Sequence, residues 1–189
     1  SVIGGAGVDT VTANSGVNTI SLADGNDLIN FAGTHLASDD TVNGGAGTDI
    51  ISYSSDETIL LADFTNVSGF EALTSANSVH IAGNLGALAA TTGIKTITFN
   101  DDGDGDNLVI DAEFNNTLRV NLDDGDNTLN AAAYTGTLTI AMTDTIAGDV
   151  ADTQTITGGT GTADEIILTT SGTGITNAQM TSITKIEKL

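Results

Sequence analysis

Short runs in which apolar and polar residues alternate recur along the chain, and each leads into glycine, aspartate or asparagine. Three of them, Ile97-Thr98-Phe99, Leu118-Arg119-Val120 and Leu138-Thr139-Ile140, begin 21 and then 20 residues apart. Alternation with a period of two predicts strands that bury one face. A strand, a turn, a second strand and a return would fill one such period. The pattern therefore predicts stacked coils of about twenty residues, the arrangement of a parallel β-solenoid.

A shorter period of nine residues governs the first thirty residues of the chain. Three columns keep this spacing, one of glycine, one of Asp or Asn and one of apolar residues: Gly7, Gly16 and Gly25; Asp9, Asn18 and Asp27; Val11, Ile20 and Ile29. The unit returns at residues 44–52, and a widened form follows at 158–167. A repeated turn that carries both glycine and a carboxylate is predicted at each of these places.

The two periods divide the chain into two parts. We expect an all-β fold with a first solenoid part over residues 1–80 and a second part, built of coils of about twenty residues, over 93–189. Residues 81–92 connect the two parts, and the stretch 84–90 is rich enough in alanine and leucine to form a short helix.

The charge balance restricts the partners. Lys and Arg number 4 against 25 acidic residues, of which 20 are Asp, so the formal charge is −21. Nucleic acid binding needs a basic surface that displaces counterions, so no nucleic acid partner is expected. No apolar stretch is long enough for membrane insertion. The absence of cysteine leaves neither a disulfide framework nor a thiolate metal site.

The nine-residue unit, Gly-Gly-x-Gly-x-Asp-x-apolar-x, resembles the calcium-binding repeat of the RTX (repeats-in-toxin) family. Residues 4–12 and 44–52 match it fully, and residues 22–30 keep its second half. Residues 13–21 keep only Gly16 and Ile20, with Asn18 in the Asp column. The resemblance implies a right-handed parallel β-solenoid, an RTX-like β-roll, with calcium held in the turns between coils.

The resemblance also implies a set of ligands for Ca²⁺. In the family, the ion lies between turns that are two nine-residue units apart, where glycine carbonyls and Asp carboxylates meet. Carried over by position, the ligands come from three turns: Gly5, Gly7 and Asp9; Asp24, Gly25 and Asp27; Gly45, Gly47 and Asp49. Asn18 is expected to pair with nothing comparable, which predicts no calcium in the opposite row of turns.

Two further acidic turns, at 101–106 and 123–126, depart from the Gly-Gly pattern. They are expected to place Asp above Asp, about one coil apart, with a repulsion of about 1 kcal/mol per pair even in a water-like dielectric. A cation would remove that repulsion, yet Asp-Gly is also an ordinary turn sequence, so both interpretations stay open. The candidate metal ligands here are Asp102, Asp104, Asp106, Asp124 and Asp126.

No group of residues predicts catalysis. His35 and His80 stand alone, and neither Ser68 nor Ser171 has the glycine two residues earlier that a nucleophile elbow requires. The blocks 44–73 and 158–189 both end in an apolar-x-x-apolar-Glu-x-Leu sequence, in which Glu71 and Glu187 are expected to have a structural role at a coil end rather than to ligate metal. We therefore expect the chain not to be an enzyme.

The resemblance implies a function outside the cell. The chain is most similar to a segment of a bacterial surface-layer lattice protein, secreted to the cell surface and folded and assembled through calcium. Its expected partners are other copies in a lattice or array, with cell-surface polysaccharide as a second candidate. The alternative is the RTX repeat region of an adhesin, toxin or hydrolase exported by type I secretion. A ligand-binding adhesin domain is disfavoured, because 2 Tyr, 5 Phe and no Trp leave little aromatic surface for stacking.

Overall fold

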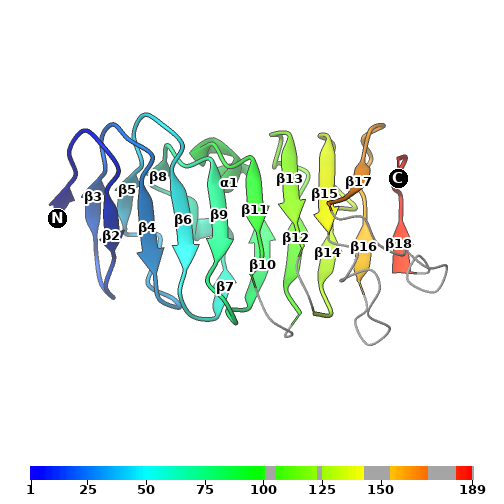
Figure 1. Cartoon of the computed structure of the whole chain (residues 1–189), viewed down its shortest axis with the longest axis horizontal. Helices are drawn as coiled ribbons and strands as arrows, with labels where there is room; N and C mark the ends of the chain where they lie inside the picture. Colours follow the sequence, from blue (N-terminus) through cyan, green and yellow to red (C-terminus); the bar gives the residue numbers. More distant parts are fainter. Residues whose placement is uncertain (101–104, 123–124, 143–153, 170–181, 189) are drawn as a thin grey trace.

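The computed structural model describes residues 1–100, 105–122, 125–142, 154–169 and 182–188. These residues form a parallel β-solenoid, whose coils follow one another along a single axis from the N-terminus to the C-terminus (Figure 1). Each strand pairs in parallel with the equivalent strand of the next coil. The predicted all-β fold and the predicted solenoid are confirmed.

One long sheet of eight strands runs through the whole solenoid, with one strand from each coil. Its strands are β2 (Thr10–Thr12), β4 (Leu28–Phe31), β6 (Ile50–Tyr53), β9 (Ala72–Ser75), β11 (Thr96–Thr98), β13 (Leu118–Asn121), β15 (Leu138–Met142) and β17 (Glu165–Leu168).

Two shorter sheets complete the solenoid. The N-terminal sheet has four strands, β1 (Val2–Ile3), β3 (Thr19–Ser21), β5 (Thr41–Asn43) and β8 (Val67–Ser68). The C-terminal sheet has six, β7 (Glu57–Ile59), β10 (Ile81–Leu85), β12 (Asn107–Ile110), β14 (Thr128–Asn130), β16 (Thr155–Thr157) and β18 (Ile183–Thr184).

The two shorter sheets form the second wall of the solenoid. This wall changes from the N-terminal to the C-terminal sheet within a single coil, which we call the junction coil. Along that coil the chain passes from β6 to β7, the first strand of the C-terminal sheet, and then through the 3₁₀ helix η1 (Leu61–Phe64) to β8, the last strand of the N-terminal sheet. The long sheet continues without a break through this coil.

The segment 81–92 contains β10 and the short helix α1 (Ala87–Thr92). The predicted helix forms, but it begins three residues later than the stretch 84–90, because Asn84 and Leu85 belong to β10. It ends at Gly93, whose φ of 111° lies in the left-handed region that favours glycine. Within the described residues, no helix has the length and apolar character needed to cross a membrane.

The core follows from the alternation in the strands. The central residue of each long-sheet strand points inward, in a row that begins at Val11 and Ile29 and continues through every later coil. This row and the facing rows of the shorter sheets make one continuous apolar core. Tilted aromatic pairs extend it at two places, Phe31 with Tyr53 at 6.5 Å between ring centres and Phe114 with Tyr134 at 6.2 Å.

The pairing register corrects one detail of the predicted coils. Leu118 pairs with Leu138, as their spacing of 20 residues predicts. Ile97, however, pairs with Val120 rather than with Leu118. That coil is therefore 23 residues long. The predicted inward and outward side chains are unchanged, because a shift of two residues in the pairing register leaves every side chain on the same face of the sheet.

Candidate metal centre

Four acidic residues occupy the same position on four successive coils, immediately before strands of the long sheet. The backbone N–H of Asp9 donates to the Asp27 carboxylate at 2.8 Å, and that of Asp27 donates to Asp49 at 2.8 Å. The N–H of Asp49 in turn donates to the carboxylate of Glu71 at 2.9 Å. The structure thus brings together three predicted ligands and extends them by Glu71. We call these four residues the acidic row.

The two middle members of the acidic row are buried and only half satisfied. Asp27 is 1% exposed and Asp49 is 0% exposed. In each carboxylate Oδ1 accepts the N–H from the preceding coil, whereas Oδ2 is buried without a hydrogen-bond partner among the described residues. A buried anionic oxygen with no partner is unfavourable. These two atoms therefore mark a place where a cation would be stabilising.

Electrostatics at Asp49 point in the same direction. Burial raises the pKa of the Asp49 carboxyl, and the charges of Asp27 and Glu71 add to the rise, while the hydrogen bond from the Asp27 backbone opposes it. At Asp49 the charged form is thus disfavoured chiefly by desolvation. A bound cation would reverse this effect, because opposite charge favours the ionised carboxylate.

The glycines of these turns allow the backbones of neighbouring coils to approach closely. A Cβ atom on Gly25 would collide with the carbonyl oxygen of Gly7, and one on Gly47 with that of Gly25. Both glycines have positive φ, 154° and 144°. Carbonyl oxygens thus face the next turn beside the Asp carboxylates. Ca²⁺ takes six to eight oxygens of these two kinds, so the residues present fit that ion.

A cation at the acidic row would need backbone carbonyl oxygens for many of its ligands. Among the described residues, no three His, Cys, Asp or Glu side chains gather closely enough to hold a metal ion. The predicted ligand Asp24 has an exposed side chain, and its carbonyl already accepts the N–H of Gly7 at 2.7 Å. Gly5, Gly45 and the carboxylate of Asp9, which accepts the N–H of Gly5 at 2.8 Å, lie in the same exposed turns. Their roles as ligands stay predictions.

A second acidic pair, Asp164 and Glu187, repeats the hydrogen bond between Asp49 and Glu71. The N–H of Asp164 donates to the Glu187 carboxylate at 2.8 Å. Both oxygens of Asp164 are satisfied, Oδ1 by the N–H of Leu138 at 3.1 Å and Oδ2 by that of Gly159 at 2.6 Å. Asp164 therefore has no need of a cation. Glu71 and Glu187 thus accept equivalent hydrogen bonds in their coils, and their structural role in place of metal ligation stays a prediction.

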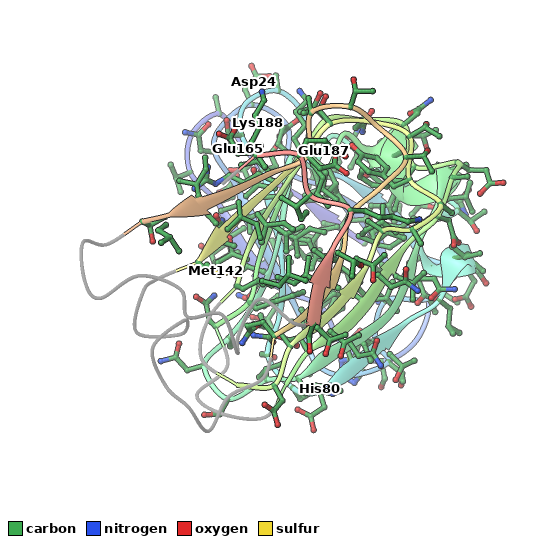
Figure 2. The ribbon with its side chains drawn as sticks, turned by 90° about the vertical axis from the view of Figure 1, so that its right-hand side faces the viewer. Asp24, His80, Met142, Glu165, Glu187 and Lys188 are labelled. Atoms are coloured by element: carbon green, nitrogen blue, oxygen red, sulfur yellow. The ribbon has the colours of Figure 1, made fainter. Side chains whose placement is uncertain are left out.

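The acidic row lies at one edge of the solenoid. In Figure 2, which looks along the axis from the C-terminal end, Glu165, Glu187 and Lys188 gather at one edge of the section and His80 lies at the opposite edge. Between the two acidic pairs, the same edge position holds the exposed Lys95 and then the fully buried Leu118 and Leu138. Acidic residues are therefore not required at every coil.

The expectation that Asn18 pairs with nothing comparable is wrong, because it pairs with the carboxylate of Asp40. Its backbone N–H and its side-chain amide both donate to Asp40 Oδ1, at 2.7 and 3.1 Å, and the N–H of Ala37 donates to Asp40 Oδ2 at 2.9 Å. Asp40 lies outside every nine-residue unit, at the end of an inserted loop, so the period did not reveal it. The only signal was its position directly before the alternating Thr41-Val42-Asn43.

The later acidic turns do not stack Asp on Asp at the described positions. The N–H of Asp106 donates to Asn127 Oδ1 at 2.9 Å, and Gly105 lies against the backbone of Asp126. The coil is 21 residues long here, so Asp106 meets an amide rather than the predicted carboxylate. Asp106 is fully buried, whereas Asp126 is exposed. Asp102, Asp104 and Asp124 lie outside the described residues.

Comparison of the chain with protein-family models, with curated proteins and with solved structures found no match in any of the three.

Close approach at the turns predicts the effect of an added methyl group. Gly47→Ala places Cβ against the Gly25 carbonyl and holds alanine at φ 144°. We expect a loss of about 3 kcal/mol in stability, and a thermal midpoint lower by about 10 °C. Gly5→Ala is the matched control, because nothing lies within 4 Å of its Cβ position. Equal midpoints for the two variants in thermal denaturation would contradict the stacking.

Proposed function

We propose that the chain is a non-catalytic structural segment of a secreted bacterial cell-surface protein, of the surface-layer lattice kind, that folds and assembles through calcium bound in RTX-like turns. One observation carries the proposal. Oδ2 of Asp27 and Oδ2 of Asp49 are buried and have no hydrogen-bond partner among the described residues, in turns whose carbonyls face the same coil boundary.

Calcium binding and folding of this chain would be thermodynamically coupled. The carboxylates of Asp27 and Asp49 would hold the ion, together with the carbonyls of Gly7 and Gly25. Bound Ca²⁺ supplies positive charge where the chain concentrates its own negative charge, and the total is −21. Because the turns bring these oxygens together only in the folded state, the free energy of binding would stabilise folding.

The proposed coil is right-handed, as in the RTX β-roll. Connections between parallel strands of one sheet are almost always right-handed, because the strands themselves twist that way. Each coil connects one strand of the long sheet to the next, parallel strand of the same sheet, so the rule applies to every coil.

Self-association is the proposed role of the outer surface. Leu60, just before η1, and Leu61, its first residue, are 59% and 45% exposed, and they line a hollow of about 530 Å³ with Gly83 and Asn84. Exposed apolar surface of this kind favours contact between proteins. The charge of −21 opposes contact between copies until cations reduce it.

Cell-surface polysaccharide is the second proposed partner. Hydrogen-bonding side chains line part of the outer face of the long sheet, where Asn121 donates to Thr98 at 2.8 Å and Asn100 donates to Thr74 at 2.8 Å. Such rows offer hydroxyl and amide groups to a sugar.

The alternative function is that of the repeat region of an exported adhesin, toxin or hydrolase. It also requires calcium in these turns, but it predicts that copies of the chain do not assemble.

Folding is expected to depend on calcium. With a chelator, circular dichroism should show loss of most β-structure, and added Ca²⁺ should restore it. Mg²⁺ should restore it poorly, because it demands a tighter octahedral shell. An equal β-signal with chelator and with calcium would contradict the proposal.

Asp27→Asn should lower the calcium stoichiometry measured by calorimetric titration. The asparagine keeps an oxygen for the N–H of Asp9 but replaces the unpaired oxygen by a hydrogen-bond donor, which a cation repels. Asp164→Asn is the control, since both oxygens of Asp164 are satisfied by N–H groups. It should reduce stability by about 1–2 kcal/mol and leave the stoichiometry unchanged. Equal losses of bound calcium would show that the acidic row is not the site.

Assembly is expected to follow folding as calcium rises, measured by light scattering and electron microscopy. Leu61→Lys should weaken assembly without changing the folding midpoint, because the side chain is 45% exposed. Thr91→Lys, on an exposed position of α1, is the control. A folded chain that remains monomeric at high concentration would favour the repeat region of an exported adhesin, toxin or hydrolase.

A further inference from the structure

The junction coil buries a group of polar side chains that the acidic row does not use. Tyr53 of β6 is 0% exposed, Glu57 of β7 is 4% exposed and Asp63 of η1 is 8% exposed. They lie where the second wall changes from the N-terminal to the C-terminal sheet. Three acidic or weakly acidic groups are thus enclosed at one point of the core.

Glu57 faces inward because of its register in the C-terminal sheet. It pairs with Ile81 of β10, and its backbone N–H donates to the carbonyl of His80 at 2.9 Å. In later coils the same position holds Asp106, Asn127 and Gln154, which are also buried. Side chains at this position therefore face the core throughout the C-terminal sheet. In β7, the first strand of that sheet, the side chain at this position is the carboxyl group of Glu57.

The polar atoms at this point are incompletely satisfied. Glu57 Oε2 and the hydroxyl of Tyr53 are buried and have no hydrogen-bond partner among the described residues. Asp63 Oδ2 accepts the N–H of Leu60 at 2.7 Å and so caps η1. An ionised Glu57 would leave a buried charge with an unpaired oxygen, which is strongly unfavourable.

The groups around Glu57 do not supply a compensating charge. Tyr53 faces it from β6, and Asp63 faces it from η1. From β10, His80 contributes backbone groups, its carbonyl to Glu57 and its N–H to the exposed Asp56 at 3.1 Å. Burial therefore raises the pKa of Glu57 from 4.5 to about 7, with the charge of Asp63 adding to the rise and the Thr58 backbone N–H opposing it.

A proton suits this point better than a metal ion. Ca²⁺ requires six to eight oxygens, and the three side chains here include one oxygen already committed to Leu60. A single proton neutralises Glu57 and turns one of its oxygens into a donor. Burial raises the pKa of Asp63 as well, although the hydrogen bond from the Leu60 backbone opposes the rise.

We propose that Glu57 is a proton-dependent switch in the junction coil: its protonated carboxyl holds β7, η1 and β8 in the buried arrangement, and its ionisation releases residues 57–68 from the solenoid. Release would expose the carboxylate to water, where the charge is solvated. It would also remove the terminal strand of each shorter sheet, since β7 and β8 occupy those places.

The direction of the pH dependence follows from the two states of Glu57. The buried form holds its proton up to about pH 7, whereas the released form loses it near pH 4.5. The stabilisation is therefore fully present below pH 4.5 and is lost as the pH rises through about 7. Calcium turns would respond in the opposite sense, because their Asp ligands must be ionised. The switch does not rest on calcium binding.

Hydrogen exchange of residues 57–68 in the whole chain tests the switch, with protection corrected for intrinsic exchange rates. In the native protein, protection should fall at least about tenfold between pH 5 and pH 8.5, and the pKa rise from 4.5 to about 7 limits the fall to about 300-fold. In Glu57→Gln, protection should not change with pH and should exceed the native value at pH 8.5. Unchanged native protection, or the native pH dependence in Glu57→Gln, would overturn the proposal.

Two controls and a direct titration complete the test. Glu113→Gln alters an exposed carboxyl and should keep the native pH dependence. The profile should keep the same midpoint at every calcium concentration at which the chain is folded, and a midpoint that moves with calcium concentration would assign the effect to a cation and overturn the proposal. If Glu57→Gln fails to fold, carboxyl NMR of the native chain decides. A Glu57 midpoint near 7 supports the switch, and one near 4.5 overturns it.

Discussion

Stacking of the coils depends on one requirement, that each buried N–H at a corner of the solenoid finds an acceptor in a neighbouring coil. Buried backbone donors are almost always paired in folded proteins. Before the long sheet, the N–H of Asp27 uses a carboxylate of the next coil, that of Asp49 uses Glu71, and that of Leu118 uses the carbonyl of Thr137. The acidic turns are therefore first of all hydrogen-bond acceptors that connect one coil to the next.

This use of carboxylates places negative charge in the interior, and the corners differ in how that charge is compensated. Asp40 and Asp164 accept N–H groups on both oxygens, and such hydrogen bonds stabilise a carboxylate without a counterion. In Asp27 and Asp49 only Oδ1 accepts an N–H group, and Oδ2 is buried with no hydrogen-bond partner among the described residues. The proposed calcium site follows from this difference between corners rather than from the number of acidic residues.

Glu57 shows a third way to deal with buried charge. Its carboxyl lies beside Asp63 and Tyr53, in the coil where the second wall of the solenoid is replaced. Hydrogen bonds satisfy Asp164, a cation is proposed for Asp27 and Asp49, and a proton is proposed for Glu57. Calcium and pH would then act on separate parts of one molecule, and in opposite directions, because one requires ionised carboxylates and the other a neutral one.

The amino-acid sequence alone determined the repeated elements: the strands, the glycine turns and the parallel solenoid. Each coil contacts its neighbours through equivalent positions, so a local pattern of apolar, glycine and acidic residues is enough to predict them. Tertiary structure alone decided which polar residues meet. Coil length changes from 18 residues between Asp9 and Asp27 to 22 between Asn18 and Asp40 and 21 between Asp106 and Asn127. The partner of a turn residue depends on that length, and the burial of Glu57 depends on a change of wall that no period in the sequence marks.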